Sequence, residues 1–151
     1  MIAKLSEQEI EEVLKDNILG HLGCNDGFNT YVYPVNYLYD GKFILCHSQD
    51  GAKVKVMRQN SRVCLQVDEI VDHENWRSVM VLGDFQELHD ERERSNAMKA
   101  FVDRQMHVKI TRANLSTNKD DQGGDAGLDK ERRPVIFRIV IDEKTGRYEV
   151  D

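Results

Sequence analysis

Two strand-like segments flank a tight-turn signal, and this hairpin pattern constrains the fold more than any other feature of the chain. The segments are residues 31–39 and 42–47, and the signal between them is Asp40-Gly41. An Asp-Gly pair between alternating apolar residues indicates a two-residue hairpin turn. Strands joined by such short turns pair in an antiparallel manner. The chain is therefore expected to build an antiparallel sheet.

The first of these strands is interrupted by two residues that fit poorly in a sheet, Pro34 and Asn36. Proline has no N–H to donate to a ladder, so it belongs at an edge or a bulge. Asparagine is depleted in packed strands. Either this strand is an edge of no special importance, or something other than a neighbouring strand lies beside it.

Similar patterns continue along the chain. Ser6 and Glu9 form a capping-box signature before a helix predicted at 7–16, and Gly83 is a plausible bulge. Other strands are predicted at 18–24, 62–69, 76–88, 134–141 and 147–150, with a turn at 143–146 and helices at 51–60 and 90–107. The predicted fold class is mainly β, a closed or nearly closed barrel with flanking helices.

Length and charge limit the protein's class. The 151 residues suit one domain, 1–151, and the net charge of −6 argues against nucleic acid or an anionic membrane as a partner. No apolar run is long enough to span a bilayer, and the first residues lack the apolar core of a signal peptide. We expect a cytoplasmic protein.

The cysteines Cys24, Cys46 and Cys64 are odd in number and form no CxxC pair, so we expect reduced thiols rather than disulfides or a metal site. The histidines show no metal-ligand spacing. Residues 116–133 are polar, charged and rich in glycine. This stretch is expected to be a long, exposed and flexible loop, with a weakly helical segment as the alternative.

A cluster of positive charge follows the hairpin. The second strand ends near Ser48, and the next helix begins near Gly51 and carries Lys53, Lys55 and Arg58. The N-terminus of a helix presents free backbone N–H groups, so this junction is a candidate anion site. An ordinary solvated helix face explains the cluster equally well. No Walker-type or GxGxxG motif is present.

Two further groups of residues are candidates for a binding site. His47 lies at the strand end beside the cluster, although a lone histidine is more often a packing or surface residue than a catalyst. Trp76, Arg77 and Ser78 open another strand. An aromatic ring, a guanidinium and a hydroxyl could line the binding site of a flat ligand, and they equally suit an ordinary strand start.

The order of these segments resembles a known family. In sequence, the chain carries ILGHLG, YVYPVNYLYDGKFILCHS, GAKVKVMRQNSRVCLQVDE and WRSVMVLGDFQEL. This order is similar to that of the pyridoxamine 5'-phosphate oxidase-like FMN-binding split barrels, and most of all to the nitroimidazole-resistance-type flavoproteins. The likeness covers about residues 5–101 and, more loosely, the terminal strands. It implies an FMN-binding split β-barrel of about six antiparallel strands.

The resemblance also implies a site and an assembly. The interrupted strand would line the flavin ring of FMN with Tyr33, Pro34, Val35 and Asn36. The phosphate would be held by Ser48 and Lys53, with help from Arg58. Another part of the pocket would be built by Trp76, Arg77 and Ser78. His47 would be the catalytic residue on the substrate side. Members of the family usually form homodimers with FMN at the subunit interface.

Three functions remain open from the sequence. The first is a flavin-dependent oxidoreductase that passes a hydride through flavin N5 to a small-molecule electron acceptor, with a nitro compound one possibility by resemblance. The second is a flavin-binding module for storage, sensing or delivery, because related barrels have different functions. The third is haem binding, which would need His47 or His107 as an axial ligand.

Overall fold

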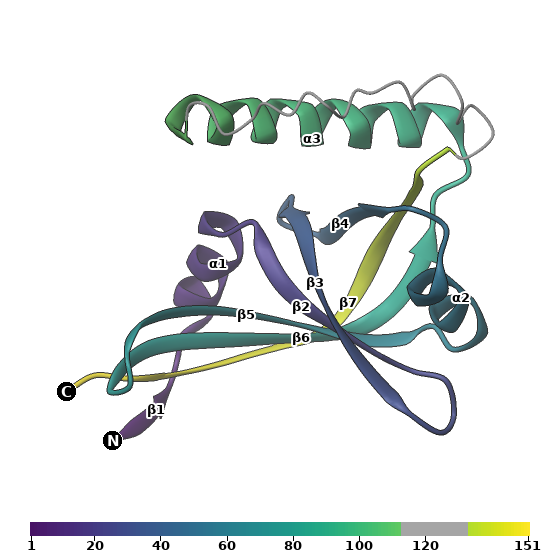
Figure 1. Ribbon diagram of the computed structural model, residues 1–151. Helices are drawn as coiled ribbons and strands as arrows, with labels where there is room; N and C mark the ends of the chain where they lie inside the picture. Colours follow the sequence, from purple (N-terminus) through teal and green to yellow (C-terminus); the bar gives the residue numbers. More distant parts are fainter. Residues whose placement is uncertain (113–132) are drawn as a thin grey trace.

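The computed structural model describes residues 1–112 and 133–151, with the side chains of 105–112 outside the description. Figure 1 shows a strand-rich body with helices around it. The helices are α1 (Glu7–Asp16), α2 (Ala52–Gln59) and α3 (Glu91–Arg112). The strands are β1 (Ile2–Lys4), β2 (Leu19–Asn25), β3 (Thr30–Tyr39), β4 (Phe43–Ser48), β5 (Arg62–Asp72), β6 (Asn75–Glu87) and β7 (Val135–Glu149).

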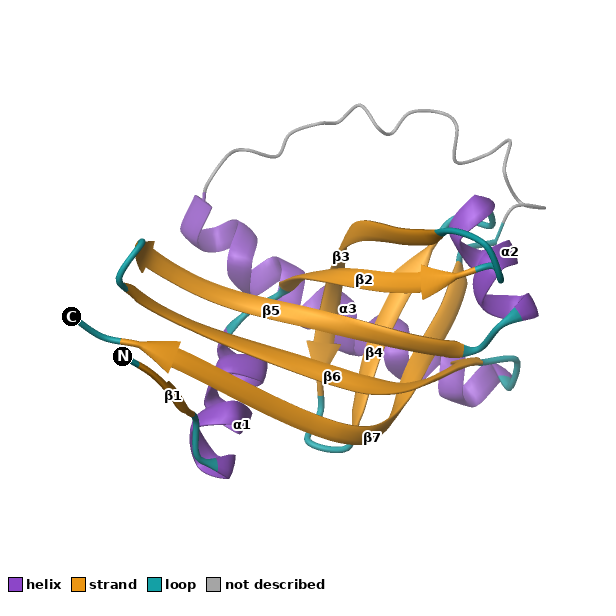
Figure 2. Ribbon diagram, turned by 90° about the horizontal axis from the view of Figure 1, so that it is seen from below, coloured by secondary structure: helices purple, strands orange, loops and turns teal. Residues whose placement is uncertain are grey.

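The strands form one antiparallel sheet that curves back on itself. Its order is β1-β7-β4-β3-β2-β5-β6, and a further pairing of β7 with β6 closes the ring. Six strands therefore make the barrel, and the short β1 extends it beside β7. Figure 2 shows the long strands β5, β6 and β7 running side by side. The predicted mainly β barrel with flanking helices is confirmed.

β7 differs from the prediction. Two strands separated by a turn at 143–146 were expected, but Val135–Glu149 is one continuous strand. The turn-like residues stay extended because β6 pairs with them: Glu143 lies opposite Leu82, and Gly146 lies opposite Val79. Pairing with a neighbouring strand thus overrides a local turn preference.

A β-bulge lies beside Gly83, but its extra residue belongs to β7 and not, as predicted, to the strand that contains Gly83. The register between β6 and β7 shifts between Leu82 and Gly83, so that Asp142 has no partner in the ladder. A bulge bends its strand and increases the local twist, which suits the strand that closes the ring. Gly83 is also in close contact with β7, since a Cβ at this position would lie 2.2 Å from the Val140 carbonyl oxygen.

The turn between β3 and β4 is longer than predicted. Residues 40–42 separate the two strands, rather than Asp40 and Gly41 alone. The Asp40 carboxylate accepts hydrogen bonds from the backbone N–H groups of Lys42 and Phe43, both at 2.8 Å. Gly41 has a φ of +95°, which favours glycine. The Asp40 side chain therefore stabilises a three-residue turn.

α1 covers one end of the barrel, and its start matches the sequence prediction. Ser6 and Glu9 form a complete capping box, with the Glu9 N–H donating to Ser6 Oγ at 3.1 Å and the Ser6 N–H donating to Glu9 Oε1 at 2.8 Å. The helix buries its apolar face against the barrel through Ile10, Val13 and Leu14. This burial, more than helix propensity, stabilises so short a helix.

α3 lies across the outside of the barrel and builds a second, smaller core (Figure 1). This core consists of Leu88, Ala97, Phe101 and Ile136, with Leu38 and Leu45 packed against it. The predicted flexible loop falls almost wholly on residues 113–132, which lie outside the described residues. No helix in the described part is both long and apolar enough to cross a membrane.

The cysteines are free thiols, as predicted. Cys24 and Cys46 are buried, and Cys64 is half-buried. Burial raises the pKa of the Cys46 thiol to about 12, so this group stays protonated at neutral pH. Among the described residues, no group of histidine, cysteine or acidic side chains is arranged to hold a metal ion.

Candidate functional site

β3 and β4 separate beyond a short ladder, and the space between their backbones is called the opening. These strands pair over only three residues each, from Tyr37↔Cys46 to Tyr39↔Ile44. The end of β4 instead follows β7, where Ser48 lies opposite Val135. The first part of β3, residues 30–36, pairs with β2 alone. Within the part of the chain that the structure describes, one edge of this segment therefore has no strand beside it, and this free edge faces the opening.

The free edge explains the interruption of β3. The Tyr37 N–H donates to the Ile18 carbonyl at 2.9 Å, which fixes the odd-numbered residues of β3 as those that bond toward β2. By the alternation of an antiparallel ladder, the backbone groups of Pro34 and Asn36 point to the free edge. Pro34 lies opposite His21. Its missing N–H therefore costs no bond to β2, and the prediction that Pro34 marks an edge is confirmed.

The four predicted ring-lining residues do not share one face of β3. Tyr33 and Val35 point into the barrel and are half-buried or buried, whereas Pro34 and Asn36 point outward and are exposed. This follows from the two-residue period of a strand. A flat ligand at the free edge would meet the backbone groups of Pro34 and Asn36 but not those of Tyr33 and Val35, which bond toward β2.

Of the side chains predicted to bind a phosphate, Lys53 is the one whose position best fits that role. Its ammonium lies 5.6 Å from the centre of the Tyr33 ring, so α2 brings this charge to the inner side of the opening. Within residues 1–112 and 133–151, Lys53 forms no ion pair. α2 begins at Ala52, and its N-cap residue, Gly51, makes no side-chain hydrogen bond to the helix, so the first N–H groups of the helix are available to a ligand. Ser48 lies three residues before Gly51, and its hydroxyl donates to the Gln49 carbonyl at 2.9 Å.

Arg58 is engaged elsewhere. Its guanidinium binds the Glu87 carboxylate at 2.9 Å and the Asp50 carboxylate at 3.2 Å. These partners, Glu87 first, raise the pKa of Arg58 further above its ordinary value. The ion pairs border a shallow polar pocket of about 200 Å³ where α2, β6 and α3 meet. The structure therefore places Arg58 beside carboxylates rather than beside Lys53.

His47 lies on the opposite side of the opening from Tyr33 and Val35. It points outward from β4 with Leu45, toward α3, and its ring meets the Phe101 ring edge-on, with 4.7 Å between centres and 79° between planes. Burial, followed by the nearby Lys53 ammonium, holds the pKa of His47 below its ordinary value. The imidazole is therefore neutral at pH 7. The side chain of His107, the other histidine considered for haem, lies outside the described residues.

Because the pKa of His47 is lowered in the folded protein, the free energy of unfolding is expected to depend on pH. Below the ordinary histidine pKa, the unfolded chain takes up a proton that folded His47 resists, so the free energy of unfolding falls as the pH falls. Between pH 7.5 and 5.5, the wild type should lose more stability in urea titrations than His47→Gln, which folds but cannot titrate there. Equal losses in the two proteins would contradict this assignment.

Trp76, Arg77 and Ser78 are not brought to the opening within one chain, because β2 and β5 lie between β6 and β3. Their side chains also alternate. Arg77 points inward and binds Glu69 at 2.6 Å. Trp76 points outward, and its Nε1–H donates to Glu149 at 3.1 Å.

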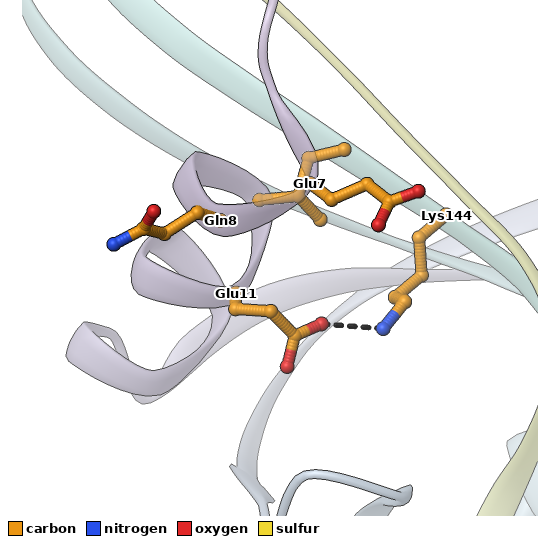
Figure 3. Close-up of a pocket in the computed structure, with 5 residues that line it drawn as sticks. Glu7, Gln8, Glu11 and Lys144 are labelled. Carbon is orange, nitrogen blue, oxygen red and sulfur yellow. Dashed lines mark hydrogen bonds and ion pairs between the residues drawn. The ribbon is translucent and has the colours of Figure 1, made fainter.

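A cavity lies between α1 and β7. Its volume is about 510 Å³, and its lining residues are Glu7, Gln8, Ile10, Glu11 and Lys144. Figure 3 shows the Lys144 ammonium bonded to the Glu11 carboxylate. The buried Tyr39 hydroxyl donates to the same carboxylate at 2.8 Å. Because these contacts tie α1 to β3 and β7, we interpret the cluster as a structural clamp. The sequence shows no signal for it.

Phe101 is a contact of His47 that the sequence analysis missed as a site residue. It is buried in the small core under α3. Its position at helical spacing marks it only as a core residue, and no local pattern links it to His47, which lies more than fifty residues earlier in the chain.

Comparison with known proteins identifies a family, a relative in sequence and proteins of similar structure. A family model described as pyridoxamine 5'-phosphate oxidase matches residues 6–147. An uncharacterized protein from Rhizobium meliloti (strain 1021) is 34% identical over 84 residues, which are 56% of this chain. The match also covers 56% of that relative, so this chain spans little more than half of its length.

Two solved structures share the fold. A FAD-binding protein from Mesorhizobium loti is 28% identical, with 100% of this chain and 98% of that chain covered and a TM-score of 0.73. A proposed 5-nitroimidazole antibiotic resistance protein from Bacteroides thetaiotaomicron is 18% identical, with 98% and 87% covered and a TM-score of 0.68. The second likeness concerns the fold alone.

Proposed function

Because the chain belongs to the pyridoxamine 5'-phosphate oxidase family, we propose that it is a flavoprotein that holds FMN in the opening between β3 and β4. The observation that carries the proposal is the ammonium of Lys53, which has no ion-pair partner among the described residues and lies near the uncapped start of α2 and the edge of β3 that no described strand covers. A phosphate attracts such a cation and the N–H groups of a helix start. A planar ring with polar edges suits a free strand edge.

Different residues of the opening would bind the phosphate and the ring of FMN. On the inner side, Lys53, Ser48 and the start of α2 bind the phosphate. Along the edge, the backbone of Pro34 and Asn36 orients the ring. Arg58 joins the phosphate site only if its bonds to Glu87 and Asp50 open, so its contribution is expected to be small.

We further propose that the protein is an oxidoreductase acting on a small acceptor. FMN, when bound, supplies hydride transfer at its N5 atom. The neutral imidazole of His47 then lies on the outer side of the opening, where it can donate a hydrogen bond to an acceptor. The resemblance of the sequence to nitroimidazole-resistance-type flavoproteins makes nitro compounds the first acceptors to test.

The Mesorhizobium protein binds FAD, which shares the ring and first phosphate of FMN. Both cofactors would use Lys53 in the same way. The additional adenylate of FAD would need further space near the phosphate site, where the ion pairs of Arg58 with Glu87 and Asp50 border a pocket of about 200 Å³. We therefore expect FMN to bind at least as tightly as FAD.

We also propose that two copies pair through the outer face of the sheet. Exposed apolar side chains gather on this face of β2, β3, β5 and β6: Leu19, Val32, Ile70 and Met80. Their registers place them on the same side as Trp76 and Ser78. Pairing would bury this apolar surface and would give Trp76 and Ser78 a route to the flavin of the other protomer.

The pairing predicts the mass of the particle in solution. Light scattering should report about twice the 17.5 kDa chain mass. Met80→Asp should shift the equilibrium strongly toward the monomer, because it buries a charge in the interface. Val71→Asp is the matched control, since Val71 is exposed at the tip of the β5–β6 hairpin. A wild-type monomer at micromolar concentration would contradict the proposal.

The experiment that tests the cofactor is an absorbance spectrum of the purified protein before and after addition of FMN. Flavin bands that persist through desalting support the proposal. A colourless protein that does not bind added FMN contradicts the proposed cofactor, although the barrel fold is unaffected by that result.

A flavin-holding protein without turnover is the second candidate function. It is favoured by one observation: within the described part of the chain, neither ring nitrogen of His47 has a hydrogen-bond partner to orient it as an acid or base. Anaerobic reduction by NADH or NADPH, followed by reoxidation with a nitroaromatic compound, supports the enzyme. Tight FMN binding with no reduction by either donor favours the holding protein.

A further inference from the structure

α3 is fixed over the outer side of the opening. Near its start, the Arg94 guanidinium donates to the Pro134 carbonyl at 3.0 Å, and Glu91 pairs with Arg133 at 2.8 Å. Farther along, the Arg104 guanidinium donates to the Lys15 carbonyl at the end of α1, also at 3.0 Å. In Figure 1 the helix spans the barrel from the β7 side to the α1 side. These contacts hold the middle of α3 at a defined place.

The outer face under α3 carries the groups that a substrate would meet. Leu38 pairs with Leu45 across the short β3–β4 ladder. Because side chains alternate along a strand, Asn36 lies on the same side as Leu38, and His47 lies on the same side as Leu45. The outward-facing side chains on the two edges of the opening, Asn36 and His47, therefore lie on the side of the sheet that α3 covers.

Packing rather than hydrogen bonding sets the orientation of His47. Its described environment offers no hydrogen-bond partner to either ring nitrogen, while the Phe101 ring meets it edge-on. Phe101 is itself buried among Leu88, Ala97 and Ile136, so its position is well determined. An imidazole held by a fixed aromatic ring keeps its nitrogens free for a ligand and its plane constant.

We propose that Phe101 is the positioning and size-limiting residue of the acceptor side, where its buried ring fixes the plane of His47 and fills the space beside it that a larger acceptor would need. The proposal deepens the proposed function and rests on it. It names two roles that are measured separately: the environment of His47, which needs no flavin, and the size of the accepted molecule, which does.

The first test is an NMR titration of the histidines in Phe101→Leu and Phe101→Ala, with the His47 signal assigned by its loss in His47→Gln. Val102→Ala is the matched control, because Val102 is the next residue of α3 and is exposed. Removing the ring admits water to the imidazole, so its pKa should rise toward the ordinary value in both Phe101 variants and stay unchanged in Val102→Ala. An unchanged His47 titration in folded Phe101→Leu overturns the positioning role.

The second test compares two acceptors that differ only in bulk, 2-methyl-5-nitroimidazole and its N1-benzyl derivative. Phe101→Ala should raise kcat/KM for the bulky compound relative to the small one at least tenfold, and Val102→Ala by less than twofold. If neither compound turns over, their affinities for the oxidised flavoprotein are compared in the same way. An unchanged ratio in a folded Phe101 variant overturns the size-limiting role.

Failure of the proposed function is distinguishable from failure of this inference. A protein that holds no flavin has no acceptor side, so that result ends the size-limiting role together with the proposed function. The His47 titration then decides the positioning contact alone. If Phe101→Ala does not fold, thermal melts identify this, and Phe101→Leu decides both tests.

Discussion

Lys53→Ala will weaken FMN binding by roughly 10- to 150-fold, the equivalent of about 1.5–3 kcal/mol for a charge-assisted hydrogen bond. The reason is that Lys53 is the cation at the inner side of the opening with no carboxylate to neutralise it among the described residues. The substitution removes that charge and leaves the helix, because alanine is a good helix former. Fluorescence titration of the apoprotein with FMN measures the change.

Lys55→Ala is the control for this prediction. Lys55 lies on the same helix and is exposed, so its loss changes the net charge equally without removing a group at the opening. Its effect on affinity should be less than about threefold, as for a screened surface charge. If Lys53→Ala binds FMN as the wild type does while Arg58→Ala does not, the phosphate lies on the Arg58 side and the proposed site is wrong.

Gly83→Ala will destabilise the fold by about 3 kcal/mol, the upper part of the usual range for overpacking. Its new Cβ would lie 2.2 Å from the Val140 carbonyl oxygen, which belongs to the backbone of β7 and cannot rotate away. Because β6 and β7 close the ring, the clash separates the strands where the barrel depends on them. For a domain of this size the melting temperature should fall by about 6–12 °C.

Gly51→Ala is the control for Gly83→Ala. A Cβ at Gly51 meets no atom within 4 Å, so the cost is limited to a weaker helix start, below about 1 kcal/mol. Urea unfolding of both variants without added flavin gives the comparison. Equal stabilities for the two variants would show that β7 moves aside, and that the close approach at Gly83 is not required for closure.

Local signals predicted the parts of the fold that depend on neighbours in sequence. The capping box of Ser6 and Glu9 indicated the start of α1, and alternation indicated most strands. The extended course of β7 has no such local signal. Its residues 143–146 resemble a turn, and only pairing with β6, more than fifty residues earlier, keeps them straight.

The candidate site shows the same division. Ser48 and Lys53 are near in sequence, so the sequence alone predicts an anion site at their junction. It does not predict the partners of Arg58, because Glu87 lies 29 residues away from that arginine. The contact between His47 and Phe101 is equally non-local.

Trp76 and Ser78 point to one face of β6 and Arg77 to the other, and this arrangement, unlike the contacts of Arg58 and His47, depends only on the local sequence. It follows from the two-residue period of a strand, so the sequence was sufficient to predict it. What the sequence could not supply is the distance of these residues from the opening, because that distance depends on the order of the strands in the sheet.

The free edge of β3 has a consequence for the protein without its cofactor. An unpaired strand edge that can hold a flat ligand can also pair with a strand from another molecule, and such pairing leads to aggregation. Pro34 lies on this edge and offers no N–H, so an incoming strand would lose a bond at the centre of its ladder. Pro34 is therefore expected to disfavour the pairing of a foreign strand at this edge while leaving the edge available to a small molecule.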